Sequence, residues 1–431
     1  MPFDLSSIDT GATAWVLASS ALVLLMTPGL AFFYGGMVRG KNVLAMLMQN
    51  FAAIMVVGFL WVFVGFSLAF GQQGGSLAKW VGNFHFYGLH HIGQVVPGYV
   101  GGFAQVIPPI VFVIFQMMFA IITPALITGA IADRAKFGTW VIFCGLWSLL
   151  VYSPVAHWVF SPTGYLFGKG ALDFAGGTVV HINAGIAGVA LAIVLGKRKG
   201  WPKEQMKPHN VPHTMLGAAL LWFGWFGFNA GSALGANELA GYAFINTNTA
   251  TATAMAGWLI VEKLRDGHST SLGAASGAVA GLVAITPAAG FITPLSAALL
   301  GLIAGAVCAL AVSLKYKIGL DDSLDVAGVH LVGGIIGSLG VGILADVRVN
   351  SFGANGVIRH GGWHLFNMQA LAVGMVIVYS FTVSLILGKI LDLTIGFRVK
   401  EEDEVTGLDQ ALHAETAYET AATAGLGRMT V

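Results

Sequence analysis

Long apolar runs constrain this chain more than any other feature of its sequence. Eleven runs are long enough to cross the roughly 30 Å hydrocarbon core of a bilayer as helices. They cover residues 13–35, 43–70, 109–131, 137–158, 176–196, 213–232, 240–262, 269–286, 291–314, 325–345 and 365–392. Only 10% of the residues are charged, against roughly 25% in an ordinary soluble domain. The sequence therefore predicts an all-α integral membrane protein with eleven transmembrane helices.

Basic residues are distributed unevenly around these runs. If the N-terminus faces outward, 17 of the 21 Lys and Arg residues fall in the inside loops, the last helix and the tail. Because positive residues favour the cytoplasmic side, the sequence predicts an outer N-terminus and a cytoplasmic C-terminus. The first dozen residues lack the basic segment of a cleavable signal peptide. We therefore expect a multi-pass protein of the cell inner (plasma) membrane that retains its first helix.

The chain divides into a membrane part and a tail. The apolar runs predict a transmembrane domain over residues 1–392, followed by a cytoplasmic regulatory tail over residues 393–431. The tail opens with Arg398, Lys400 and the acidic run 401–404. It is shorter than the roughly 50 residues of a small domain, so it is too short for a catalytic output domain.

Two stretches of the sequence match each other. Asp173 is followed eight residues later by His181, inside an apolar helix, and Asp322 is followed eight residues later by His330. Glycines stand four and seven residues after each histidine. In the predicted topology the fifth and tenth helices run in opposite directions, so each acid lies at a different mouth. This arrangement predicts an inverted repeat of helices one to five and six to ten, with an eleventh helix added.

The two histidines are candidate pore residues. In inverted repeats the substrate site lies near the midplane at the repeat interface, where His181 and His330 are placed to meet. A lone buried histidine is often structural, but intramembrane ionisable residues tend to mark transport pathways. A neutral imidazole pair suits a small polar molecule or a proton, whereas bare ions would lose too much hydration.

Metal binding and enzymatic chemistry fit the sequence less well. Two histidines alone make a poor metal site, because a catalytic zinc normally has three protein ligands. His85, His90 and His91 lie in the longest outer connection and offer a second metal candidate, although the sequence favours a solvated loop over a metal site there. No acid is evident near the two buried histidines, which disfavours an intramembrane enzyme. The sequence suggests no cofactor and no nucleic-acid partner.

Several longer motifs resemble one known family, the ammonium transporters (Amt/Mep, related to the Rh proteins), and specifically its Amt branch. The likeness runs from the first helix to Tyr418. The matching motifs, in chain order, are Asp173–Asn183 (DFAGGTVVHIN), Lys207–Asn210 (KPHN), Gly224–Ser232 (GWFGFNAGS), Asp321–Asp322 with Gly328–His330, and the tail segment Gly396–Asp409.

This resemblance implies a homotrimer with one hydrophobic pore in each subunit. It implies an outer vestibule that recruits ammonium or methylammonium, deprotonation there, and passage of ammonia between twin histidines. Our hypothesis is that a proton is transferred as well, so that transport carries net charge. At the positions of the family's functional residues, this chain has His181, His330 and Trp225 in the pore, Phe119 and Phe228 at an outer gate, and Ser232, Asp173, Phe160 and Gln116 in ammonium recruitment.

One position departs from the family pattern. The aromatic box usually has a tryptophan three residues after a histidine, whereas here His157 is followed by Phe160 at that place. Because tryptophan is the best cation–π ring, the affinity of the outer site is affected unless the neighbouring Trp158 compensates.

Two other functions remain open: an ammonium sensor and an electroneutral ammonia gas channel. The resemblance also implies a PII-type signal protein as a partner at the cytoplasmic exit.

Overall fold

The computed structural model describes the chain except for residues 1–4, 72–74, 94–95, 97–105 and 419–431. The described residues form helices and no strand, as the all-α prediction requires. The longer helices are α1 (Thr10–Met37), α2 (Val43–Leu60), α4 (Pro109–Ile131), α5 (Phe137–Trp147), α8 (Asn183–Leu195), α9 (Val211–Gly231), α10 (Glu238–Asp266), α11 (Ser271–Ile285), α12 (Pro294–Ala311), α14 (Val332–Leu344) and α15 (His364–Thr394).

Shorter elements extend or connect these helices. The short α-helices are α3 (Phe66–Phe70), α6 (Ser153–Phe160), α7 (Tyr165–Gly168), α13 (Leu314–Ile318), α16 (Glu401–Thr406) and α17 (Leu408–His413). The 3-10 turns are η1 (Leu5–Ser7), η3 (Ser76–Lys79), η4 (Tyr87–Leu89) and η8 (Val357–Arg359). The wider π-helical turns are η2 (Trp61–Gly65), η5 (Ser148–Tyr152), η6 (Gly177–Ile182) and η7 (Ala327–Leu331).

Eight helical segments of the described chain are long and apolar enough to cross a membrane. Each coincides with one of the eleven predicted runs. The other three runs also form helices, α9, α10 and α11. However, α11 has only 15 residues, and α10 carries buried polar side chains such as Asn246 and Thr247. A membrane crossing by these three helices therefore stays a prediction.

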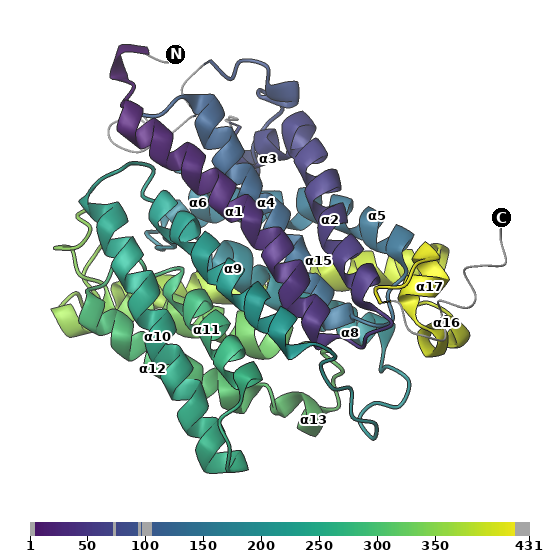
Figure 1. The fold of residues 1–431 in the computed structure, drawn as a ribbon. Helices are drawn as coiled ribbons and strands as arrows, with labels where there is room; N and C mark the ends of the chain where they lie inside the picture. The colour runs from purple at the N-terminus through teal and green to yellow at the C-terminus, as the bar shows by residue number, and fades with distance from the viewer. Residues whose placement is uncertain (1–4, 72–74, 94–95, 97–105, 419–431) are drawn as a thin grey trace.

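Close packing between α1 and α9 depends on glycine. A methyl group added at Gly217 would meet the backbone of Phe33, and one added at Gly227 would meet the backbone of Ser19. Small residues let membrane helices approach each other closely. Accordingly, α1 and α9 run side by side across the molecule (Figure 1).

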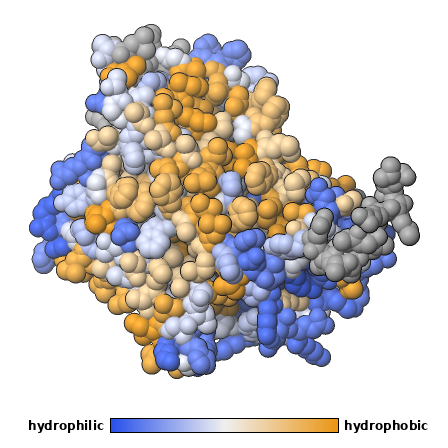
Figure 2. All heavy atoms as spheres, in the orientation of Figure 1, coloured by the Kyte–Doolittle hydropathy of each residue, from blue (hydrophilic) through white to orange (hydrophobic). Residues whose placement is uncertain are grey.

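The surface is apolar over a broad area. In Figure 2, hydrophobic side chains cover the middle of the visible face, while hydrophilic residues gather at its margins. Large exposed apolar residues include Met55, Phe59 and Phe223. Exposed patches larger than a few hundred Å² are rare on soluble monomers and mark membrane or protein contact. The surface thus agrees with the predicted membrane location.

Candidate functional site

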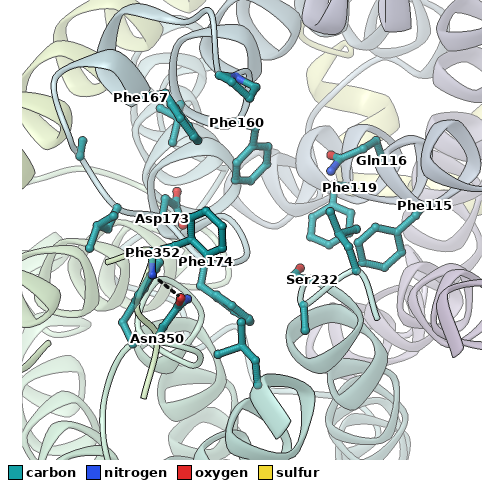
Figure 3. Close-up of a pocket in the computed structure, with 18 of the residues that line it drawn as sticks. Phe115, Gln116, Phe119, Phe160, Phe167, Asp173, Phe174, Ser232, Asn350 and Phe352 are labelled. Carbon is teal, nitrogen blue, oxygen red and sulfur yellow. Dashed lines mark hydrogen bonds between the residues drawn. The ribbon is translucent and has the colours of Figure 1, made fainter. Parts of the chain in front are cut away.

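A cavity of about 240 Å³, here called the outer cavity, lies at the end of the molecule predicted to face outward. It brings together five of the predicted site residues: Gln116, Phe119, Phe160, Asp173 and Ser232. These residues come from α4, α6, the end of α9 and the segment before η6. Figure 3 shows aromatic rings on opposite sides of the cavity. These segments are far apart in the chain, so the sequence alone did not predict that they meet.

Two of these residues present hydrogen-bond acceptors. The Gln116 side chain is largely buried, and its Oε1 atom has no hydrogen-bond partner among the described residues. The Ser232 hydroxyl donates to the backbone oxygen of Phe228 at 2.8 Å, which leaves the hydroxyl oxygen available as an acceptor. A buried acceptor without a partner costs free energy, so Gln116 is suited to a ligand that donates a hydrogen bond.

The Asp173 carboxylate accepts hydrogen bonds from the backbone N–H groups of the following helical turn. Its Oδ1 accepts from the N–H groups of Gly176 and Gly177, both at 2.7 Å, and its Oδ2 accepts from the N–H of Thr178 at 2.8 Å and from the Thr178 hydroxyl. Gly176 has φ 117°, a left-handed conformation that suits glycine. Asp173 therefore fixes the start of the helix that carries His181, and its carboxylate holds negative charge at a helix N-terminus.

Two phenylalanines separate the outer cavity from the interior. The rings of Phe119 and Phe228 lie with centroids 4.3 Å apart and planes 33° apart. Phe119 lines the outer cavity, whereas Phe228 lines a second cavity of about 10 Å³ that we call the pore cavity. Both side chains are at most 1% exposed. The predicted gate pair is thus in contact at the boundary between the two cavities.

The predicted pore residues meet in the pore cavity. His181 Nδ1 and His330 Nδ1 are 3.3 Å apart, and their rings are nearly parallel at 18°. The Trp225 ring also stacks on His181, with ring centroids 5.3 Å apart. The remaining lining residues, such as Leu30 and Val279, are apolar apart from these rings. One imidazole donates to the other, which orients both rings in an otherwise apolar cavity.

Both histidines lie in π-helical turns. His181 is in η6 and His330 is in η7, each directly before a regular helix, α8 or α14. Such turns occur often at functional sites, because they displace side chains from regular helical positions. Sequence periodicity did not predict these turns.

Asp322 repeats the capping role of Asp173. Its two carboxylate oxygens accept from the N–H groups of Val326 at 3.1 Å and Ala327 at 2.7 Å, at the start of η7. Burial raises the pKa of Asp322 to about 6, although the positive charge of Lys315 opposes this rise, and Asp325 adds to it. The matched acid–histidine stretches thus have matched local structures.

Trp158 does not replace the missing tryptophan of the outer cavity. Its indole N–H donates to the backbone oxygen of Trp80 at 2.7 Å, and its ring packs against Tyr379. Phe160 lines the outer cavity, and Trp158 is not among its lining residues. Trp158 and Phe160 both lie in α6, about half a helical turn apart, so their side chains point in different directions. The expectation that Trp158 compensates for the missing tryptophan is therefore wrong.

Sequence reasoning missed several aromatic residues of the outer cavity. Phe167, Phe174, Phe291 and Phe352 also line it, together with Asn350. Asn350 and Phe352 come from the connection between α14 and α15, far along the chain from Phe160. The only signal was the unusual number of phenylalanines, 28 in all, which does not identify particular positions.

The three outer-loop histidines form no metal cluster within the described part of the chain. The rings of His85 and His91 stack with centroids 4.8 Å apart, while His90 lies farther away at 6.5 Å from His91. No group of three potential metal ligands occurs among the described residues. The metal alternative therefore finds no support in the geometry.

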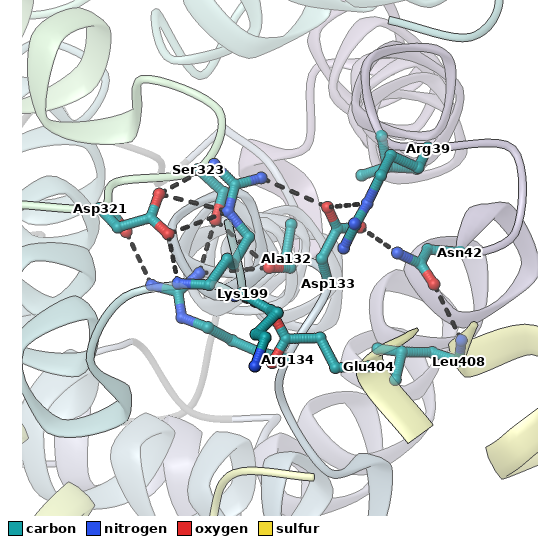
Figure 4. Close-up of polar contacts among 12 residues, drawn as sticks. Arg39, Asn42, Ala132, Asp133, Arg134, Lys199, Asp321, Ser323, Glu404 and Leu408 are labelled. Carbon is teal, nitrogen blue, oxygen red and sulfur yellow. Dashed lines mark hydrogen bonds and ion pairs between the residues drawn. The ribbon is translucent and has the colours of Figure 1, made fainter. Parts of the chain in front are cut away.

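A network of buried charged side chains lies beyond the C-terminal end of α4, which is predicted to be cytoplasmic. Figure 4 shows its polar contacts. Arg198 bridges two acids, contacting Asp133 at 3.3 Å and Asp321 at 2.8 Å. Arg134 is fully buried and donates to Ser323 Oγ at 2.6 Å and to the backbone oxygen of Asp321 at 2.7 Å. Burial lowers the pKa of Arg134 to about 10, so it stays charged at neutral pH.

The tail docks onto this network. Glu404 accepts from the Lys199 backbone N–H at 2.6 Å and pairs with Arg398 at 2.7 Å. Asn42 links Asp133 to the backbone N–H of Leu408, which it accepts at 2.8 Å. The helix α17 packs against the start of α2, and α16 packs against α17 (Figure 1). The described part of the tail is therefore packed against the membrane part through hydrogen bonds and ion pairs.

Comparison with known proteins gives consistent matches over almost the whole chain. The family model described as Ammonium Transporter Family matches residues 14–418. An ammonium transporter of Mycobacterium tuberculosis is 54% identical, over 97% of this chain and 92% of its own length. Candida albicans Mep2 has a similar fold, with a TM-score of 0.86 at 34% identity, covering 92% of this chain and 88% of its own. A solved protein titled Sensor Amt Protein gives a TM-score of 0.84 at 30% identity, covering 94% and 98%.

Proposed function

Because the chain belongs to the ammonium transporter family, a family of membrane transport proteins rather than enzymes, we propose a specific route for ammonium. The cation enters the outer cavity, where phenylalanine faces and the acceptors of Ser232 and Gln116 attract it. It loses its proton near Phe119 and Phe228. Neutral ammonia then passes the histidine pair to the cytoplasm.

One observation carries this proposal: a cavity of about 10 Å³ contains the contact between His181 and His330 directly behind the phenylalanine pair. A space of this size is just enough for one water-sized molecule, on a measure by which water needs roughly 10–15 Å³. Hydrated cations are too large for it, and an unhydrated cation would find few polar atoms to replace its lost water. Ammonia fits both in size and in polarity.

We infer that the proton also crosses, so that transport carries net charge. The direct contact between the two imidazoles supports this inference, because each ring can accept a proton on one side and release it on the other. Electroneutral passage of ammonia gas is the alternative. The two differ in whether an ammonium gradient drives a current.

The proposed topology has eleven crossings, an outer N-terminus and a cytoplasmic C-terminus in the inner membrane. The matched caps by Asp173 and Asp322, each ahead of a π-turn with a histidine, support two inverted five-helix halves. A cysteine introduced near the N-terminus should react with an impermeant thiol reagent in whole cells, and one introduced in the tail should not. The reverse pattern would contradict this topology.

We further propose a homotrimer that binds a PII-type signal protein through the cytoplasmic face. The apolar surface supports contacts with lipid and with other subunits (Figure 2). Native mass spectrometry should detect three copies of the 45.0 kDa chain.

A pull-down with the full-length protein, and with residues 393–431 deleted, tests the PII partner. If the full-length protein does not bind it, this part of the proposal is wrong.

Uptake into proteoliposomes tests the transport function. Labelled methylammonium should enter saturably, and unlabelled ammonium should compete with it. Empty liposomes provide the control. If the purified protein gave no uptake above that control, the transport proposal would fail.

A sensor function is the second candidate, favoured by the similarity to the Sensor Amt Protein. A sensor would bind ammonium without transporting it, so the same assay separates the two functions.

A further inference from the structure

The outer cavity is far larger than ammonium requires. On the measure by which a water molecule needs roughly 10–15 Å³, the outer cavity offers about 240 Å³ and the pore cavity about 10 Å³. Ammonium is about as large as water. The space in front of Phe119 and Phe228 therefore accepts a much larger cation than the space behind these residues.

The walls of the outer cavity have the chemistry of a cation site. Among the described residues that line it, seven are phenylalanines, none is a lysine or an arginine, and Asp173 is the only charged one. In Figure 3, Phe160, Phe167 and Phe352 lie across the cavity from Phe119. A cation between these rings can contact aromatic faces on more than one side, which is how quaternary ammonium ions are recognised.

Hydrogen-bond acceptors are few in this cavity. The Asp173 carboxylate already accepts from the backbone of residues 176–178, and Asn350 Oδ1 accepts from the Phe352 N–H. Gln116 Oε1 has no partner among the described residues, and the Ser232 hydroxyl oxygen can also accept. An ammonium ion has four N–H donors to satisfy, whereas a tetraalkylammonium ion has none. These two acceptors leave part of an ammonium ion unsatisfied, so the cavity also suits an alkylated cation, which needs no acceptor.

We propose that the outer cavity binds small quaternary ammonium ions of the tetramethylammonium class, which occupy it but do not pass through the protein. Such an ion has no N–H proton to lose, so it cannot become a neutral amine. Its four methyl groups also exceed the space of the pore cavity. In terms of the proposed function, on which this inference rests, the ion is a competitive inhibitor of ammonium transport.

Calorimetry with the purified full-length protein tests binding without any need for transport. Tetramethylammonium chloride is titrated into the protein, with sodium chloride at the same concentration as the salt control. We expect saturable heat only with tetramethylammonium. Phe352→Leu keeps an apolar side chain but removes one aromatic face, so affinity should fall roughly three- to tenfold, as for the loss of one cation–π contact. Phe59→Leu, on the exposed surface of α2, is the matched control and should bind as the wild type does.

Transport currents test the competition. In proteoliposomes, tetramethylammonium should raise the ammonium concentration that gives half-maximal current, leave the maximal current unchanged, and evoke no current itself. If calorimetry shows no saturable binding, or if Phe352→Leu and Phe59→Leu bind equally, the proposal is wrong. A tetramethylammonium current would also overturn it. Absence of any ammonium current would instead count against the proposed function, and calorimetry would still decide whether the cavity binds the cation.

Discussion

At the scale of single residues, Trp225 packs against the histidine pair through its contact with His181. Its ring is stacked 5.3 Å from His181 at an angle of 17°, and its indole N–H donates to Thr286 Oγ1 at 2.9 Å. The Thr286 hydroxyl in turn donates to the backbone oxygen of Leu282. This chain of hydrogen bonds fixes the orientation of the indole, and the indole limits the positions available to His181.

Thr286→Val tests this contact because it keeps the shape of the side chain and removes the hydroxyl. The buried indole N–H would then lack its partner, which should cost about 1 kcal/mol of stability. Trp225→Phe should remove the N–H and its need for a partner, so the double variant should cost less than the sum of the single variants. Thermal unfolding in detergent measures all four proteins. Strictly additive costs would show that the hydrogen bond does not contribute.

Asp322 gives a prediction on pH dependence. The pKa of this buried carboxyl is raised from 3.8 to about 6, chiefly by burial. The folded protein therefore favours the protonated form, and its stability contribution from Asp322 is present below about pH 4 and is lost as pH rises through about 6. The raised pKa corresponds to a cost of about 3 kcal/mol at most for keeping the carboxylate charged.

Asp322→Asn removes this charge and should stabilise the folded protein more at pH 8 than at pH 5. Comparing the two pH values cancels the hydrogen bond that the amide loses, because that loss applies at both. Melting temperatures of the wild type and the variant at each pH measure the difference. An equal effect at both pH values would mean that the carboxyl titrates at its ordinary pKa.

At the scale of elements, the tail supplies a cap for a distant helix. Asn42 stands directly before α2 but makes no cap hydrogen bond, because its side chain contacts Asp133 and Leu408. Instead, Asp409 Oδ1 accepts from the N–H of Ala45 in the first turn of α2, at 2.8 Å. A carboxylate at this place satisfies an N–H group left free at a helix start and also interacts favourably with the helix dipole. Docking of the tail and the start of α2 are thus directly linked.

Asp409→Ala should loosen the described tail without unfolding the membrane part. The lost cap is worth about 1 kcal/mol, which corresponds to a roughly fivefold faster opening of the docked tail. Hydrogen exchange of residues 401–413 measures this opening. Glu402→Ala is the control, because Glu402 is exposed and pairs with the equally exposed Lys400. Equal exchange in both variants would contradict the capping role.

At the scale of the whole molecule, the apolar runs predicted the helices, and the motif spacing predicted the histidine pair. The apolar runs located every long helix, because roughly 20 apolar residues in sequence are needed to cross a bilayer. The matched acid–histidine spacing identified the pair that meets at 3.3 Å. Both signals are local in the sequence.

Features that depend on distant contacts were not predictable. Phe352 joins Phe160 in the outer cavity only because the α14–α15 connection folds over it. The side to which Trp158 points depends on its packing against Trp80 and Tyr379. The capping of α2 by Asp409 joins residues 364 positions apart. No periodicity in the sequence reports such contacts.

The most direct test of the account is the current on a solid-supported membrane after an ammonium pulse. Proteoliposomes would contain the wild type, His181→Ala, His330→Ala, or His90→Ala as a control from the exposed outer loop. We predict a saturable current for the wild type and for His90→Ala, and its loss in both pore variants. An undiminished current in either pore variant would contradict the account. So would an absence of current in the wild type while the lumen becomes alkaline, because ammonia would then cross without a proton.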